Sequence, residues 1–255
     1  MTGEPSIRIL PDAEAASRAA AEVIALALRE AVEERGRADW ATTGGSTPVG
    51  IYHALAAPPL LDLVRWAGVH VWWGDDRYVS RDDPLSNVRP LDRELLPGVP
   101  LPVANVHAMA MDDAIASGAG PAWVAEASES ALRQAGLEIA ESGFPILDVV
   151  LVGIGGDGHV LSVFPGSPLF DATAWVSAVP APTHIEPRVA RVSLHPRILA
   201  EARIPMVVAH GAGKAAILAS VFGAERDERR WPAQIARFAG AVWFLDRDAA
   251  SSLPG

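Results

Sequence analysis

The sequence predicts an α/β fold in which a doubly wound, mostly parallel sheet is flanked by helices, as in Rossmann-like domains. Short apolar runs alternate with longer helical patterns, which is typical of βα units on a parallel sheet. Three of the apolar runs also end in turn-forming residues, at the position where open α/β sheets form their ligand crevice. The chain has 255 residues, and we expect one domain over residues 1–255.

The expected elements follow the chain in order. An apolar run predicts a first strand at residues 7–10, and a stretch rich in Ala, Glu and Arg predicts a long helix that Asp12 caps and Gly36 ends. Further strands are expected at residues 40–43, 69–73, 147–154, 190–194, 206–210 and 241–245. Shorter helices are expected at residues 49–55, 86–96 and 215–221.

Composition excludes several classes of function. The 31 acidic against 21 basic residues give a net charge of −10, and the arginines are scattered, so nucleic acid is not an expected partner. No apolar run approaches the roughly 18–20 residues that span a bilayer, and residues 1–10 do not resemble a signal peptide, so we expect no membrane partner and a cytoplasmic location. With no cysteine, catalysis must use His, carboxylates, hydroxyls, Arg or the single lysine, Lys214.

The segment TTGGSTP, residues 42–48, links a predicted strand to a predicted helix. Gly44 and Gly45 allow a tight turn, Ser46 or Thr47 can cap the helix, and the positive end of the helix favours an anion. The segment indicates either a phosphate site or a capped turn without a ligand.

The segment GIGGDGH, residues 153–159, surrounds Asp157 and His159 with four glycines. Three of these fit the dinucleotide pattern G-x-G-x-x-G, but the βαβ context is missing, so we expect neither a nicotinamide nor a flavin. A histidine placed by glycines at a strand end suits a general base, which Asp157 could orient. Alternatively, Asp157 caps a following helix whose first turn contains His159. The other six histidines lack metal-ligand spacing and are interpreted as structural.

Two further segments carry candidate binding residues. In WGDDRYV, Arg77 could clamp a phosphate or carboxylate and Asp75 could accept hydrogen bonds from sugar hydroxyls, whereas the alternative is an exposed Asp76–Arg77 ion pair. Lys214 follows a glycine turn at the start of a predicted helix, where a cation opposes the helix dipole, so its position suggests an anionic ligand. The alternative for Lys214 is an ordinary surface charge.

Five segments in this order resemble the 6-phosphogluconolactonase family, whose fold is shared with glucosamine-6-phosphate deaminase and isomerase. They are GGSTP at 44–48, WGDDRYV at 73–79 with SN at 86–87, DVVLVGIGGDGHVLSVFPG at 148–166, PRVARVSL at 187–194 and GAGK at 211–214. The resemblance implies hydrolysis of 6-phospho-D-glucono-1,5-lactone, a small phosphosugar lactone, in the oxidative pentose phosphate pathway, without metal or cofactor. It implies that His159 is the base and Asp157 its partner. It assigns the phosphate to a set of residues comprising Gly44, Gly45, Ser46, Thr47, Arg77, Lys214 and Arg188.

The chain departs from the family pattern after the DGH motif, where Val160 and Leu161 replace the usual Thr-Ala. A lost threonine hydroxyl would affect helix capping or substrate contact. A deaminase or isomerase of the same fold is the alternative function, although GDDR resembles the lactonase form of a loop that reads Met-Asp-Glu-Tyr in deaminases. A second alternative function is that of a non-catalytic sugar-phosphate sensor. We expect a monomer or a weak homo-oligomer.

Overall fold

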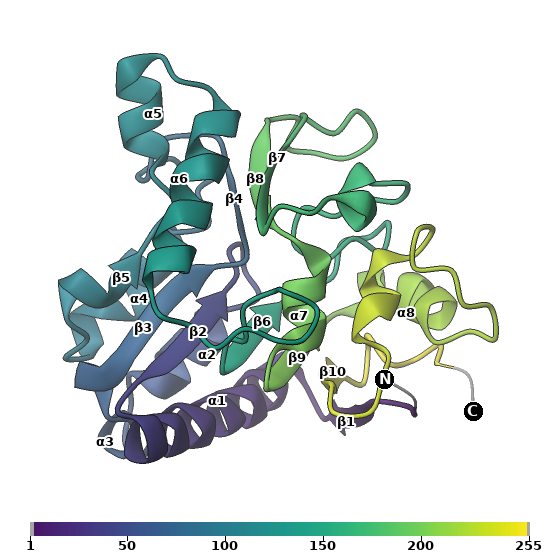
Figure 1. Cartoon of the computed structure of the whole chain (residues 1–255). Helices are drawn as coiled ribbons and strands as arrows, with labels where there is room; N and C mark the ends of the chain where they lie inside the picture. The colour runs from purple at the N-terminus through teal and green to yellow at the C-terminus, as the bar shows by residue number, and fades with distance from the viewer. Residues whose placement is uncertain (1–2, 254–255) are drawn as a thin grey trace.

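The main sheet contains seven strands, all paired in parallel, in the computed structural model of the chain, which describes residues 3–253 (Figure 1). Residues 1–2 and 254–255, the ends of the expected 1–255 domain, lie outside the described residues. The strand order is β1-β10-β9-β6-β2-β3-β5. The strands are β1 Ser6–Leu10, β2 Ala38–Thr42, β3 Val69–Trp73, β5 Val106–His107, β6 Val149–Val152, β9 Ile204–Ala209 and β10 Val242–Asp246.

The strand order confirms the predicted doubly wound sheet. From β2 the chain proceeds through β3 to β5 in one direction, and it then returns to the other side of β2 as β6 and continues outward through β9 and β10. The direction therefore reverses between β2 and β6, which pair through Trp40 with Val149 and Ala41 with Val150. In open α/β sheets the ligand crevice lies beyond the carboxyl ends of the strands at this reversal point. The GGSTP and GGDGH loops follow these two strands.

The helices flank the sheet. They are α1 Ala13–Arg35, α2 Val49–Leu55, α3 Leu60–Leu63, α4 Arg89–Glu94, α5 Met111–Ser117, α6 Pro121–Gln134, α7 Pro196–Glu201 and α8 Ala215–Val221. The prediction for α1 is confirmed at both ends: Asp12 accepts a hydrogen bond from the Ala15 N–H at 2.8 Å, and Gly36 ends the helix with φ 73°. Its buried face is rich in alanine, which allows close packing along the sheet (Figure 1).

A second, three-stranded antiparallel sheet contains β4 Asp75–Arg77, β8 Arg191–Leu194 and β7 Val176–Val179. Two sequence expectations were wrong here. The strand expected at residues 190–194 forms, but in this sheet rather than in the parallel one, and the turn-forming residues GDDR, 74–77, that follow the run 69–73 contain the strand β4. The polar β4 forms because β8 pairs with it along its length and its two carboxylates receive hydrogen bonds.

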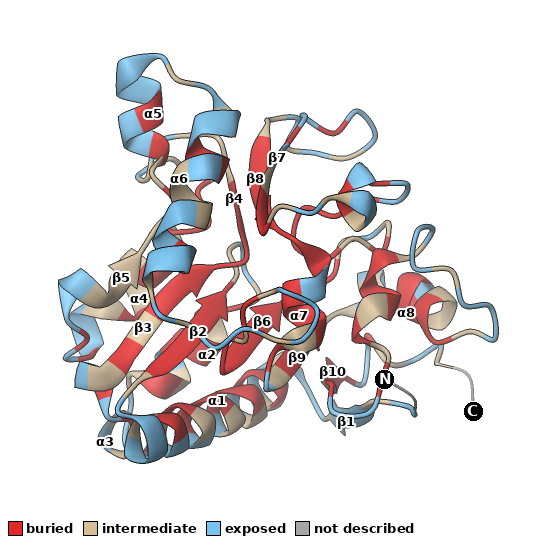
Figure 2. Cartoon of the chain, in the orientation of Figure 1, coloured by how far each residue is buried: buried red, intermediate tan, exposed pale blue. Residues whose placement is uncertain are grey.

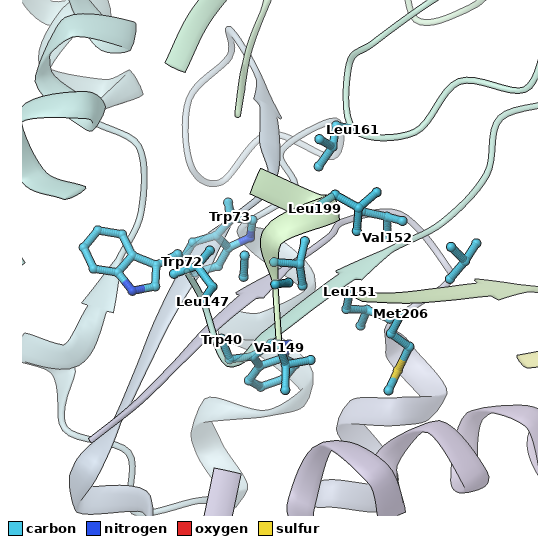
Figure 3. Close-up of a cluster of buried hydrophobic side chains, with 14 of the residues drawn as sticks. Trp40, Trp72, Trp73, Leu147, Val149, Leu151, Val152, Leu161, Leu199 and Met206 are labelled. Atoms are coloured by element: carbon cyan, nitrogen blue, oxygen red, sulfur yellow. The ribbon is translucent and has the colours of Figure 1, made fainter. Parts of the chain in front are cut away.

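The core lies along the central strands of the sheet and the helices that pack on them. The central strands are buried along their length (Figure 2), and Trp40, Trp73, Val149, Leu151 and Met206 pack together there (Figure 3). The Trp73 indole also donates a hydrogen bond to the Asn87 carbonyl at 2.9 Å, which fixes the segment before α4 to the core. Within residues 3–253, none of the helices combines the length and apolarity that crossing a bilayer demands.

Candidate active site

A cavity of about 210 Å³ lies at the carboxyl ends of β2 and β6, at the reversal point of the sheet. Its walls come from the two glycine-rich loops, β4, β8 and the segment before α4; they are Thr43, Gly44, Gly45, Ser46, Thr47, Asp75, Arg77, Asn87, Gly153, Ile154, Gly155, His159, Leu161 and Arg191. A larger, shallower hollow of about 910 Å³ includes Gly36 and Gly68, which precede β2 and β3. That hollow lies at the amino ends of the strands, and its walls include a Glu33–Arg65 ion pair but no histidine. We therefore place the chemistry in the smaller cavity, whose wall includes His159.

The first glycine loop forms one wall. The expected side-chain cap is absent: Pro48 is the N-cap of α2 and no side chain caps the helix, so Ser46 and Thr47 face the cavity instead. Gly44 lies against Asn87, and a Cβ atom at position 44 would be 2.0 Å from the Asn87 Oδ1. Gly45 has φ 73°, a conformation that glycine adopts readily. The loop therefore brings backbone and hydroxyl groups to the cavity rather than bulky side chains.

The second glycine loop holds a histidine–aspartate pair. His159 Nδ1 lies 2.6 Å from Asp157 Oδ1. Burial alone would raise the pKa of Asp157, but hydrogen bonds from His159 and His184 outweigh it and hold the pKa well below the usual carboxylate range. An ionised carboxylate only accepts hydrogen bonds, so His159 Nδ1 carries a hydrogen, and in the neutral imidazole Nε2 is the nitrogen with the lone pair. Among the described residues Nε2 has no hydrogen-bond partner.

The alternative interpretation, in which Asp157 caps a helix that begins at His159, is wrong because no helix follows this loop. The residues after His159 form a tight turn in which Val160 pairs with Val163. Asp157 instead accepts a hydrogen bond from the His159 N–H at 3.1 Å, which closes a local turn. Val160 is completely buried in this turn. Because no helix follows, a threonine at this position would have no helix to cap. Leu161, with φ 56°, lines the cavity.

Two arginines reach the cavity, one of which the sequence analysis missed. Arg77 donates from Nη1 to the Leu85 carbonyl at 2.7 Å, and its Nε is buried without a partner. Arg191 is 2% exposed, and its Nε is also buried without a partner. Arg188, the residue suggested by the resemblance, does not reach the cavity: its exposed side chain pairs with Glu186 at 3.0 Å. The signal that could have identified Arg191 is an arginine within the apolar strand at residues 190–194, because a buried charge needs a partner.

The two aspartates of β4 are buried, so the alternative interpretation, an exposed Asp76–Arg77 ion pair, is wrong. Asp75 lies at the cavity wall, but its oxygens already accept hydrogen bonds from Asn87 and Ser162. Its carboxylate therefore holds these two side chains, and the contact with sugar hydroxyls stays a prediction. Asp76 accepts the N–H groups of Asn87 and Arg77, while burial raises its pKa to about 7. Asn87, at the start of the helix expected over residues 86–96, precedes α4 and lines the cavity.

Lys214 lies behind the second glycine loop. Its Nζ donates a hydrogen bond to the Ile154 carbonyl at 2.7 Å, and its side chain is not among the cavity walls. Burial lowers the pKa of the Lys214 ammonium, and the nearby Asp157 charge opposes this. Lys214 belongs to the short 3₁₀ helix Ala212–Lys214 that precedes α8, close to its predicted place. Because Ile154 lines the cavity, the ammonium group that binds its carbonyl lies directly behind the cavity wall.

Residues 11–244 match the model of the family described as glucosamine-6-phosphate isomerases/6-phosphogluconolactonase. The 6-phosphogluconolactonase of Streptomyces coelicolor is 35% identical over 260 residues, covering 100% of this chain and 97% of that protein. The 6-phosphogluconolactonase of Mycobacterium tuberculosis is 34% identical over 253 residues, covering 98% of each.

Solved structures agree in fold. The crystal structure of 6-phosphogluconolactonase from Leishmania guyanensis superposes with a TM-score of 0.84 at 29% identity and covers 99% of this chain and 100% of that one. A monomeric glucosamine-6-phosphate deaminase has a TM-score of 0.76, covering 97% and 99% of the two chains, but at 17% identity it supports the fold alone.

Proposed function

The chain belongs to the glucosamine-6-phosphate isomerase/6-phosphogluconolactonase family, and from this premise we propose how it hydrolyses 6-phospho-D-glucono-1,5-lactone to 6-phospho-D-gluconate in the oxidative pentose phosphate pathway. The observation that supports the mechanism is the unpartnered Nε2 of His159 at the wall of a cavity that two arginines also line. A lactone is an activated ester, so its hydrolysis needs a base for water and donors for the oxyanion.

His159 acts as the general base. Its Nε2 takes a proton from water while the water oxygen attacks C1 of the lactone, and Asp157 stabilises the imidazolium that forms. N–H groups of the glycine loops donate to the oxyanion of the tetrahedral intermediate. The bond between C1 and the ring oxygen then breaks, and the imidazolium returns its proton to that oxygen. The products are a carboxylic acid, which ionises, and a free hydroxyl group.

The phosphate is held by the first glycine loop together with Arg77 and Arg191. The loop contributes Gly44, Gly45, Ser46 and Thr47. Arginine donates in a planar fork that matches phosphate oxygens, and both guanidinium groups have a buried Nε with no protein partner. Lys214 adds positive charge behind Ile154. A net charge of −10 does not oppose this, because a few converging cations set the local potential.

The test is hydrolysis of the lactone by the purified chain, corrected for the spontaneous reaction, with glucosamine 6-phosphate as the comparison substrate. His159→Ala should lower kcat by about 10² or more, the usual contribution of a general base. Deamination of glucosamine 6-phosphate without lactone hydrolysis would favour the deaminase alternative. Stabilisation by 6-phosphogluconate with no turnover of either substrate would favour a sensor.

The remaining expectations stay predictions. We propose that residues 1–255 act as one domain, as a monomer or weak homo-oligomer located in the cytoplasm. Light scattering of the purified chain, with and without 6-phosphogluconate, measures the oligomeric state.

A further inference from the structure

A second histidine contacts Asp157. His184 lies in the loop between β7 and β8, 27 residues from Asp157 in the chain, and its Nε2 is 2.8 Å from Asp157 Oδ2. Its spacing from the other histidines indicates no metal site and predicts only a structural role. Its side chain is 48% exposed, so burial does not explain its position.

Asp157 therefore connects two imidazoles through different oxygens. Oδ1 receives the His159 Nδ1–H and the His159 backbone N–H, whereas Oδ2 receives the His184 Nε2–H. A carboxylate anchored through one oxygen can still rotate about its last side-chain bond. With both oxygens occupied, the direction of the His159 ring is fixed from behind.

Phe164 holds the two imidazoles from one side. Its ring centroid is 4.8 Å from that of His159 and 5.7 Å from that of His184, where the rings meet edge to face. Phe164 is itself buried, and the Arg191 guanidinium lies 5.3 Å from its centroid. The position of His184 is therefore supported by an aromatic contact as well as by its hydrogen bond.

The charges that face Asp157 come from four segments. They are His159 in the same loop, His184 in the β7–β8 loop, Arg191 in β8 and Lys214 before α8. Arg191 and Lys214 act on Asp157 through space, and among the described side chains only the two histidines donate hydrogen bonds to it. Removal of His184 therefore frees one oxygen of the carboxylate that supports the base.

We propose that His184 is a positioning residue for the hydrolytic reaction, which holds Oδ2 of Asp157 so that Oδ1 directs His159 into the cavity. This proposal rests on the proposed function, in which His159 is the base. Removing a group that holds a metal-ligating histidine from behind typically costs 10–100-fold, and we take the same range for a group that orients a catalytic histidine. Because the His184 side chain is half exposed, we expect its removal to lower kcat by the lower end of this range, about tenfold.

His184→Leu tests this role, with His184→Gln as the variant that restores an N–H donor. His184→Leu should lower kcat about tenfold with little change in KM, because the substrate contacts remain. The acid limb of the kcat/KM profile should also move to higher pH, since the freed carboxylate holds the His159 proton more firmly. His184→Gln should recover most of kcat. The matched control is His53→Leu, which removes another exposed histidine, paired with Glu94 at 2.7 Å outside the cavity.

Two results would overturn the role of His184 while leaving lactone hydrolysis intact. One is a His184→Leu variant with wild-type kcat and an unmoved pH profile. The other is a loss of kcat that His184→Gln does not recover and that accompanies a lowered Tm, which would indicate a structural role. Absence of lactone hydrolysis by the wild-type chain would instead overturn the proposed function itself.

Discussion

Alanine at position 155 would place a methyl group inside the His159–Asp157 pair. Its Cβ would lie 2.0 Å from His159 Nδ1, 2.2 Å from Cε1 and 2.7 Å from Asp157 Oδ1. Non-bonded heavy atoms normally stay about 3.5 Å apart, so the imidazole would have to retreat by roughly 1.5 Å or the pair would have to open. Either change moves Nε2 away from the position from which it reaches water.

We expect Gly155→Ala to lower kcat for lactone hydrolysis about 10²-fold, because a misplacement of about 1 Å can cost that much. Gly156→Ala is the matched control: it adds the same methyl group one residue on, where no atom lies within 4 Å. Both variants should keep far-UV circular dichroism close to wild type. Steady-state kinetics at saturating lactone measures the effect.

Near wild-type kcat in Gly155→Ala would contradict this prediction, since His159 would then tolerate displacement or another group would be the base. An equal loss in Gly156→Ala would also contradict it, because the effect would come from loop stiffness rather than from the contact with His159.

Three further predictions concern charges around the cavity. Lys214→Ala should raise KM more than it lowers kcat if its charge favours the phosphate equally in ground and transition states, and an unchanged KM would assign it to holding Ile154 alone. Arg191→Met should raise KM at least tenfold, whereas Arg188→Met, outside the cavity, should not; equal effects would contradict the assignment of Arg191. Burial raises the pKa of Asp76 from 3.8 to about 7, so the folded protein binds a proton that the unfolded chain releases, and this group stabilises the fold less as pH rises through that window. Asp76→Asn should therefore raise Tm relative to wild type at pH 8 more than at pH 4, and an equal difference at both pH values in thermal unfolding would argue against burial of an ionised Asp76.

The fold was predictable where local patterns decide it. Asp12 and Gly36 mark the ends of α1, and the apolar runs predicted the central strands within a few residues. The second sheet was not predictable, because β4 is polar and forms a strand only when β8 pairs with it. Single-sequence patterns do not contain this long-range pairing.

The site was predictable as loops but not as a set of contacts. Glycines at strand ends identified both loops, and Asp157 and His159 lie together as expected. Arg191 was missed because an arginine in an apolar strand looks the same in sequence whether its side chain points inward or out. His184 reaches Asp157 through the path of a proline-rich loop, and no spacing rule describes such a path.

The adjacency of β2 and β6 also has a kinetic consequence. The two glycine loops come from distant parts of the chain, and the Asp39 N–H meets the Asp148 carboxylate across 109 residues at the start of these paired strands. Contacts of such high sequence separation form slowly, because the entropy of closing a long loop must be lost first. After dilution from denaturant, helices such as α1 can form early while the cavity is still two separate halves. The rate at which turnover is regained during refolding thus measures the pairing of β2 with β6, whereas the far-UV circular dichroism signal measures the formation of local helical structure.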